Sequence, residues 1–194
     1  FCSLHICDMF PKTGRWLLGR ALRQWPVDLE GERTPDARAQ PAVSFIVGHR
    51  GMDRLPQLKL TLESIRRQHG IDIECLVVEQ DSTARIRPHL PEWVRYHQAP
   101  LPGGETRYGR AAAFNAGARL ARGEVLILHD NDLPAPRAYA AEVWRMHRQG
   151  YEAAHLGRFV FYLDRPSSER LLARACVWVN ATVERVVEAA RGLE

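Results

Sequence analysis

An apolar run that ends abruptly in two acids is the feature that most restricts how this chain can fold. Residues 125–128 read Val-Leu-Ile-Leu, and His129 then leads into Asp130, Asn131 and Asp132. A short apolar run bounded by polar turn residues is typical of a buried strand. Such a strand delivers two like charges to the edge of a core, where a cation has to neutralise them.

The acid pair predicts a divalent metal site. Mg²⁺ and Mn²⁺ prefer oxygen ligands and are commonly held by one or two carboxylates, while substrate phosphates complete the shell. We therefore expect Asp130 and Asp132 to bind Mn²⁺ or Mg²⁺ together with a phosphate-bearing ligand. The alternative is a strand followed by an ordinary Asn/Asp turn that leads into the helix after Pro136. Taken alone, the triplet favours this alternative.

Composition describes an ordinary globular chain. Of 194 residues, 45% are hydrophobic and 26% are charged, which is enough apolar sequence for one domain with a substantial core. The net charge of +4 comes mostly from arginine, which suits anionic phosphates but can equally follow from genome base composition. Four cysteines in a chain of this size, no membrane-spanning run and no secretory signal favour a reducing, cytoplasmic location.

The sequence predicts an N-terminal helix and a linker before the main domain. Residues 1–25 space apolar and aromatic side chains at helical intervals among arginines, which predicts an amphipathic helix. We expect this helix to pack on its own domain or on sequence outside this chain. The alternative is that it docks on a membrane surface or on a partner. Residues 26–41 read as a polar linker, so we expect a compact domain over residues 42–194. Because the first residue is Phe1, we also expect the chain to be a piece of a longer protein.

Within that domain, strand-like and helix-like patterns alternate, which predicts a mainly parallel sheet with helices on both faces. Short apolar runs predict strands at residues 43–47, 73–79, 94–98 and 124–129, with one or two more in 152–163. Amphipathic spacing predicts helices at residues 55–68, 110–122 and 136–149, and a last helix capped by Ser167 or Ser168 that runs toward Arg191.

Ligands of open parallel sheets bind beyond the carboxyl ends of the strands, where the strand order reverses. If the first and fourth strands are neighbours, Arg50 faces the acid pair across a crevice that suits a metal-bound nucleotide diphosphate. The polar residues at the carboxyl ends are therefore candidates: Gly48, His49, Arg50, Gly51, Glu79, Gln80, Asp81, Ser82, Asp130, Asn131 and Asp132.

Two residues at the start of the alanine-rich helix are further candidates. Arg110 places a cation in the first turn, where it opposes the helix dipole at a cost of roughly 0.3 to 1 kcal/mol. A locally unfavourable residue is typical of a functional position, here phosphate binding, although a solvated arginine explains it equally well. Tyr108 is expected either to stack on a base or sugar ring or to cover the sheet edge.

Five segments, taken in order, resemble a known family: residues 43–50, 58–68, 74–81, 114–117 and 121–132. They resemble the nucleotide-sugar half of GT-A glycosyltransferases, most closely family 2. Residues 108–117 and 130–134 are also similar to β-1,4-galactosyltransferases. The likeness covers about residues 42–140, and five motifs in the right order are more specific than any one alone.

The resemblance implies a Rossmann-like, three-layer α/β/α domain that binds a nucleotide sugar, most simply a UDP-sugar, with a divalent metal. It also implies a hexosyltransferase acting on a glycan or lipid-linked acceptor, without nucleic acid, in the cytoplasm or peripherally at the inner membrane. The implied donor-binding residues are Gly48, His49, Arg50, Glu79, Asp81, Tyr108, Arg110, Asn115 and Asp130, and the implied metal ligands are Asp130 and Asp132, with Asp132 the more direct.

The sequence departs from the family pattern in three places. Gly48 and His49 stand where the first loop usually carries Pro and an aromatic residue, and Glu79 replaces a shorter Asp. The family's catalytic base lies in an acidic motif after the Asp-x-Asp, and the acids after Glu169 have no such context. The catalytic residue is therefore left unassigned. We expect a donor-binding portion that is incomplete on its C-terminal acceptor side and weak or inert in transfer.

Two other classes of function are weighed against this expectation. A nucleotidyltransferase-like, Mg²⁺-dependent enzyme would carry a Gly-rich phosphate loop after the first strand, of which residues 48–51 are a thin version. A non-catalytic nucleotide-sugar-binding or interaction module would fit the arginine content. However, the basic residues are spread along the chain, and no segment resembles a nucleic-acid-binding motif.

Overall fold

The computed structural model describes residues 11–36, 39–101, 107–154, 159–173 and 181–188. The chain divides into two compact units. The central unit is formed by residues 27–149, and the terminal unit by residues 1–26 together with 150–194. The boundary expected after residue 41 thus falls inside the central unit, and residues expected to belong to one domain are shared between the two.

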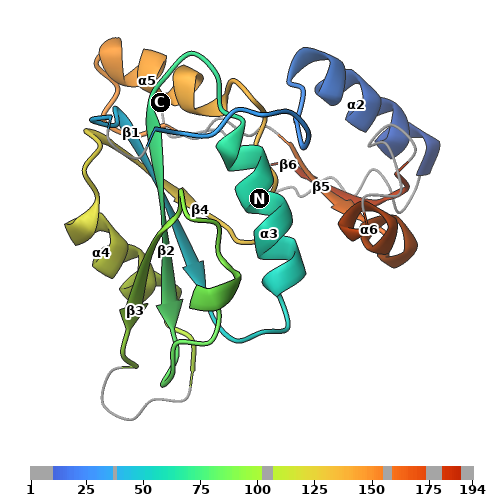
Figure 1. Ribbon diagram of the computed structural model, residues 1–194. Coiled ribbons are helices and arrows are strands. Elements are labelled where there is room, and N and C mark those ends of the chain that lie inside the picture. Colours follow the sequence, from blue (N-terminus) through green and yellow to red (C-terminus); the bar gives the residue numbers. More distant parts are fainter. Residues whose placement is uncertain (1–10, 37–38, 102–106, 155–158, 174–180, 189–194) are drawn as a thin grey trace. The chain divides into compact units, whose positions relative to one another are not determined.

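The central unit contains a four-stranded, fully parallel sheet with the order β3-β2-β1-β4 (Figure 1). Its strands are β1 (Val43–His49), β2 (Ile73–Gln80), β3 (Arg95–Ala99) and β4 (Val125–His129). The first and fourth strands are hydrogen-bonded neighbours. The condition on which the predicted crevice depended is therefore met.

Helices cover both faces of this sheet. On one face, Ala113 packs into a cluster with Ile46 and Val78. On the other face, the ring of Phe45 contacts the ring of Tyr139 at a centroid distance of 6.3 Å. Strand side chains alternate between the two faces, and both faces are covered. Every residue of β1 and β2 is therefore buried. The helices of this unit are α3 (Leu55–Arg66), α4 (Arg110–Leu120) and α5 (Tyr139–Arg148), with a 3₁₀ turn η1 (Arg87–His89).

In the described part of the chain, the end strand β4 buries one face and exposes much of the other. Ile127 and His129 are buried, whereas Leu126 and Leu128 are 40% and 54% exposed. The apolar run that predicted a buried strand therefore belongs to a strand at the edge of the sheet, with alternating burial.

At the amino ends of the strands, one buried carboxylate ties several elements together. The Glu74 carboxylate accepts hydrogen bonds from the Ser44 hydroxyl, from the Arg95 guanidinium and from the backbone and side chain of Arg122. Gly123 follows directly, and a Cβ there would lie 2.7 Å from the backbone nitrogen of Ser44. The turn into β4 therefore requires glycine because it runs against β1.

The terminal unit combines α2 (Pro11–Gln24), β5 (Phe159–Leu163), α6 (Arg165–Leu172) and β6 (Val183–Glu188). β5 and β6 form an antiparallel pair. The apolar side chains of α2 pack against this pair through a cluster of Leu18, Leu22, Ala181, Val183 and Val186. The predicted N-terminal helix therefore buries its apolar face on the chain itself. No helix among the described residues is long and apolar enough to cross a membrane.

The prediction of a long last helix is wrong. Helix α6 ends at Leu172, and its cap is Asp164, whose carboxylate accepts a hydrogen bond from the backbone of Ser167 at 2.9 Å. Val183 and Val186 are three residues apart, which fits one face of a helix, but pairing with β5 makes this segment a strand, as β-branched residues prefer. An irregularity in the register at Tyr162 and Leu163 is consistent with both valines joining one cluster. Residues 189–194 lie outside the described residues.

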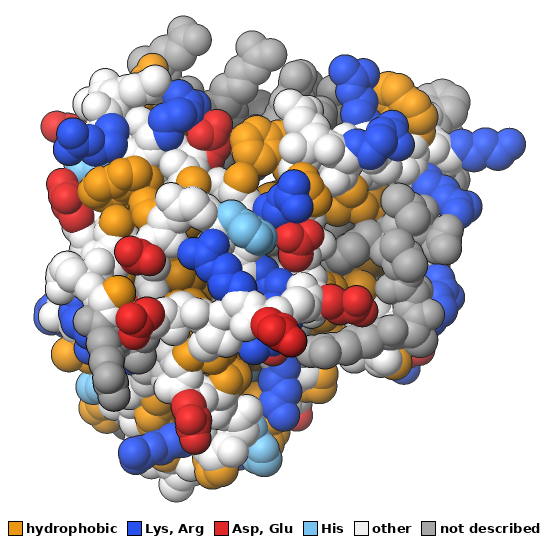
Figure 2. Space-filling view, turned by 45° about the horizontal axis from the view of Figure 1, so that its top comes forward, with side chains coloured by type: hydrophobic (Ala, Val, Ile, Leu, Met, Phe, Trp, Pro, Cys, Tyr) orange, Lys and Arg blue, Asp and Glu red, His pale blue; other side chains and the backbone are white. Residues whose placement is uncertain are grey.

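On the face drawn in Figure 2, Lys and Arg side chains are interspersed with Asp and Glu side chains. The arginine content is thus not gathered into one continuous basic surface on that face. This distribution agrees with the spread of basic residues along the sequence.

Candidate functional site

The candidate site lies at the carboxyl edge of the sheet, where β1, β2 and β4 end together. From β1 the chain builds β2 and β3 on one side and then returns to place β4 on the other side. The strand order therefore reverses between β1 and β4, which is where open α/β sheets bind ligands. The register sets His49 beside Glu79 and Val47 beside His129.

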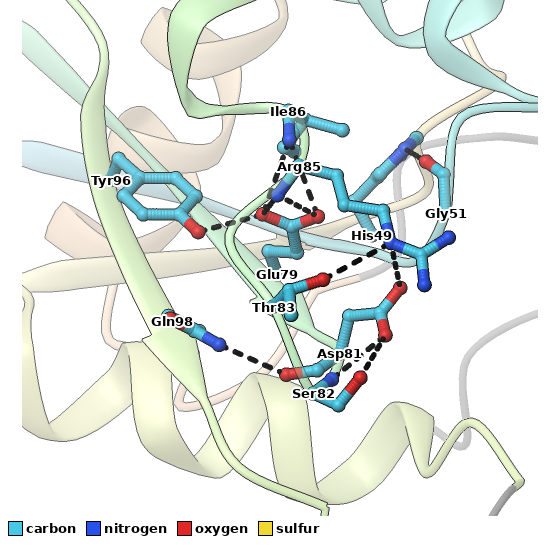
Figure 3. Close-up of polar contacts among 10 residues, drawn as sticks. All are labelled: His49, Gly51, Glu79, Asp81, Ser82, Thr83, Arg85, Ile86, Tyr96 and Gln98. Carbon is cyan, nitrogen blue, oxygen red and sulfur yellow. Dashed lines mark hydrogen bonds and ion pairs between the residues drawn. The ribbon is translucent and has the colours of Figure 1, made fainter.

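His49 joins the turn after β1 to the turn after β4. Its ring is fully buried, and Nε2 donates to the carbonyl of Gly51 at 2.8 Å (Figure 3). Because that nitrogen carries the proton, Nδ1 of the neutral ring accepts from the side-chain amide of Asn131, also at 2.8 Å. Burial is the largest influence on the His49 pKa and lowers it below its ordinary value, which favours the neutral ring.

The turn that carries the two acids is held from two more directions. The His129 ring donates from Nε2 to the carbonyl of Leu133 at 2.6 Å and so closes the turn on itself. The Thr61 hydroxyl of α3 donates to the carbonyl of Asn131 at 3.2 Å. With the bond to His49, both the side chain and the backbone of Asn131 are fixed, and the flanking acids are fixed with them.

Ser64 of α3 and Gln68, two residues beyond the end of α3, support the next segment in the same way. The Ser64 hydroxyl accepts from the backbone of Ala135 at 2.8 Å. The Gln68 amide accepts from the backbone of Ala140 and donates to the carbonyl of Pro136, both at 2.8 Å. Thr61, Ser64 and Gln68 are fully buried. Sequence analysis missed this polar stripe, although polar residues at helical spacing on an apolar helix face were a signal that could have found it.

Each acid of the pair forms an ion pair with an arginine from a different element. Asp130 lies 2.6 Å from the guanidinium of Arg110 at the start of α4. Asp132 lies 2.8 Å from the guanidinium of Arg54, the residue before α3. All four side chains are 43% to 63% exposed, so the pairs lie at the surface of the edge. Arg110 was expected in the site. Arg54 was missed, although it too is a cation at a helix start.

Tyr108 lies at the end of β1 beside these charges. A Cβ atom at Gly48 would collide with the Tyr108 hydroxyl, so glycine is what allows the ring to approach the strand. Burial raises the Tyr108 pKa most, Arg110 lowers it and Asp130 raises it, which places the phenol near both charges. The predicted residues Gly48, Tyr108, Arg110 and Asp130 are therefore brought together.

Glu79 lies beneath the loop that follows β2. Its carboxylate is fully buried and accepts hydrogen bonds from the backbone of Arg85 at 3.1 Å and of Ile86 at 3.3 Å, and from the Tyr96 hydroxyl at 2.6 Å (Figure 3). Burial and the bond to Glu79 raise the Tyr96 pKa. Glu79 thus shapes residues 81–86 from inside.

The other predicted residues take different positions. Asp81 follows the end of β2 and accepts hydrogen bonds from the backbone and hydroxyl of Ser82. Arg50 is half-buried directly after β1. Asn115 lies on the exposed side of α4, away from the buried Ala113 and Gly117 and more than one turn beyond Arg110.

The carboxylates present fit a metal that arrives with its ligand. Among the described residues, no group of three or more His, Cys, Asp and Glu is arranged to hold a metal ion. Asp130 and Asp132 offer two carboxylates at an exposed edge, which matches Mg²⁺ or Mn²⁺ sites where water and phosphates fill the other positions. His129 is unsuited as a ligand because its ring is buried and donates to Leu133.

A solved structure and a family model are similar to this chain. A solved structure, the mannosyltransferase PcManGT from Pyrobaculum calidifontis in complex with GDP-Man and Mn²⁺, is 25% identical, with a TM-score of 0.41. The similarity covers 87% of this chain and 48% of that protein, so the chain spans about half of its length. No curated protein matches the chain. The model of the family Glycosyl transferase family 2 matches residues 52–186, which is more than half of the chain. The chain therefore belongs to glycosyl transferase family 2.

Proposed function

We propose that this chain binds a nucleotide sugar, most simply a UDP-sugar, with Mn²⁺ or Mg²⁺ at Asp130 and Asp132. The protein to which it belongs would transfer a hexose to a glycan or lipid-linked acceptor. The observation that carries the proposal is the exposed acid pair at the switch point of the sheet, flanked on two sides by arginines. Family membership supports the reaction class.

The proposed roles follow from where each residue lies. Asp132 and Asp130 hold the metal, and the bound metal supplies charge stabilisation for the departing diphosphate. Arg50 and Arg110 bind the diphosphate, because a guanidinium matches phosphate oxygens with two parallel hydrogen bonds. Tyr108 provides a ring beside Gly48 for the base or the sugar.

Two of the expected donor contacts take a supporting role in this proposal. His49 and Glu79 are fully buried, and both have protein hydrogen-bond partners. They position the loops around the donor, and Asp81 at the end of β2, which is also buried and bonded to Ser82, remains a predicted contact of the nucleoside. Asn115 remains a predicted donor contact from the exposed side of α4.

Calorimetric titration with UDP, in the presence of Mn²⁺ and then of chelator, tests the donor site. The wild-type chain is expected to bind UDP only with metal, and Asp132→Asn is expected to weaken that binding by roughly tenfold or more, since a metal ligand is lost. Asp72→Asn, an exposed acid before β2, is the matched control and is expected to bind like wild type.

Other results of the same titration would contradict the proposal. Binding that persists in chelator but falls steeply with salt would indicate a general polyanion surface. Tighter binding of GDP than of UDP would overturn the UDP assignment and keep the donor site.

We also propose peripheral association of the protein with the cytoplasmic side of an anionic membrane. Support comes from the side of α2 opposite its buried Leu18. It is exposed and carries Lys12, Arg15, Arg20 and Arg23 around Trp16, which is 56% exposed, and α2 has no acidic residue. Cations attract anionic headgroups, and tryptophan prefers the membrane interface.

A further inference from the structure

We propose that Arg54 is a further diphosphate-binding residue, and that Arg54 and Arg110 exchange partners when the donor binds. Each arginine leaves its aspartate for a phosphate oxygen as the aspartate takes the metal. This inference rests on the proposed donor site and adds to it a residue and a change of ion-pair partners on binding. No covalent bond is made or broken in the exchange: two ion pairs are replaced by contacts of the arginines with phosphate and of the aspartates with the metal.

The two ion pairs have matching geometry. The Arg54 guanidinium donates from Nη1 to Oδ2 of Asp132 at 2.8 Å, and the Arg110 guanidinium lies 2.6 Å from Oδ1 of Asp130. The two arginines come from different elements, α3 and α4, so they flank the acid pair. In each pair the arginine contacts one of the two oxygens that the aspartate could offer to a metal.

The charges explain why the exchange favours metal and diphosphate together. With each acid paired to an arginine, the four side chains are neutral as a group. A divalent metal that took both acids alone would leave two arginine charges uncompensated at the same edge. The two negative charges of a donor diphosphate would compensate the two arginines. Arginine also binds phosphate through bidentate hydrogen bonds.

The surrounding structure allows the arginines to move while the acids stay in place. Asn131 between the acids is held through its side chain by His49 and through its carbonyl by Thr61. The Arg54 and Arg110 side chains are 63% and 59% exposed, so rotation about their long stems disturbs no buried contact. The Arg110 guanidinium also lies 5.4 Å from the ring centroid of Phe114.

The place of Arg54 in the sequence agrees with an anion partner beyond Asp132. Arg54 is the N-cap residue of α3 and makes no side-chain capping bond there, and the first turn of α3 has no acidic residue. A cation at this position opposes the helix dipole, whereas an anion is favoured. Without a ligand, Asp132 compensates the positive charge of Arg54 at the start of α3. A bound phosphate would compensate it instead.

The test uses Arg54→Gln and measures metal and nucleotide separately. Titration of Mn²⁺ alone, followed by the electron paramagnetic resonance of the free ion, is expected to show binding about 2- to 5-fold tighter than wild type, because an exposed competing ion pair is gone. Titration of UDP at saturating Mn²⁺ is expected to show binding about 10-fold weaker, because a charged phosphate contact is lost. Arg54→Lys is expected to recover part of the UDP affinity.

Opposite effects on the two ligands distinguish this role from a purely structural ion pair. Arg145→Gln, which breaks a similarly exposed pair with Glu142 on α5, is the matched control and is expected to change neither titration. Unchanged UDP binding by Arg54→Gln, or weaker Mn²⁺ binding, would overturn the inference while the proposed function stands. A wild-type chain that binds Mn²⁺ but no nucleotide would overturn both.

Discussion

At the scale of single residues, the site is organised by groups that do not face solvent. His49 follows the pattern of a donor-cradling loop, yet its ring is buried and bridges Gly51 and Asn131. Glu79 occupies an expected acidic donor position, yet its carboxylate binds backbone groups of the following loop. Both residues act by fixing the loops that present other side chains.

The bond between Asn131 and His49 gives a direct prediction. Asn131→Ala leaves the Nδ1 acceptor of a fully buried ring without its partner, so the free energy of unfolding is expected to fall by about 1–3 kcal/mol. Metal-dependent UDP binding is expected to weaken as well, because the flanking acids lose their anchor. Urea denaturation and calorimetry measure the two effects.

Asn115→Ala is the matched control for stability, since the Asn115 side chain is exposed on α4. Its free energy of unfolding is expected to stay within about 0.5 kcal/mol of wild type. Equal stability of wild type and Asn131→Ala would show that the buried bond contributes nothing.

At the scale of elements, α3 is the scaffold of the acid-bearing segment. Its leucines face the core, and its Thr61 and Ser64, together with Gln68 just beyond the helix, hydrogen-bond the segment that runs from Asn131 to Ala140. This helix therefore packs on the core through its apolar residues and positions the acid-bearing segment through its polar ones. The backbone groups of a segment lying over a core need such partners, because water does not reach them.

Helix α2 buries its apolar face and exposes a basic one, and this exposed face predicts membrane binding. The double variant Arg20→Gln, Arg23→Gln is expected to reduce co-sedimentation with phosphatidylglycerol vesicles by roughly tenfold or more, since each cation near an anionic surface contributes about 1 kcal/mol. Adding Trp16→Ala to the double variant is expected to reduce co-sedimentation further. Phosphatidylcholine vesicles are expected to bind neither wild type nor the variants.

The control for this experiment removes two exposed arginines of the central unit, Arg119 and Arg148, by substitution with glutamine. That variant is expected to sediment with anionic vesicles like wild type. An equal loss in both double variants would mean that net charge alone, rather than the face of α2, drives the association.

At the scale of the whole molecule, the candidate site and the hydrogen bonds of Glu74 lie at opposite edges of the parallel sheet. The carboxyl edge holds the candidate site, and the amino edge holds the buried Glu74 with its bonds to Ser44, Arg95 and Arg122. Burial by itself raises the Glu74 pKa, but these hydrogen bonds outweigh it and lower the pKa from 4.5 to about 2.

This shift predicts a specific dependence of stability on pH. Because the folded-state pKa is depressed, the contribution of Glu74 is fully present above pH 4.5 and is lost as the pH falls through about 2. Glu74→Gln is expected to lower the free energy of unfolding by about 2–3 kcal/mol at pH 7, with a smaller difference from wild type at pH 3. Urea denaturation at both pH values measures it.

UDP binding by folded Glu74→Gln at neutral pH is expected to match wild type, because the two edges of the sheet are separate. A difference in stability that is the same at pH 3 and pH 7 would contradict the assignment of the depressed pKa to this carboxylate.

The sequence by itself determined the order of strands and helices in the central unit, the acid pair at the carboxyl edge and the resemblance to family 2. These features are written in local patterns: apolar periodicity, turn residues and short motifs. The same local patterns predicted residues 183–188 wrongly, because the spacing of Val183 and Val186 fits one face of a helix, whereas pairing with β5 makes the segment a strand with an irregular register.

Only the tertiary structure decided the partners inside the site. Arg54 meets Asp132 across 78 residues of sequence, and Asn131 meets His49 across 82. No local pattern reports whether a polar side chain at a strand end turns inward to a backbone group or outward to a ligand. That choice depends on which groups the folded chain leaves without hydrogen-bond partners, because burying an unpaired polar group is unfavourable.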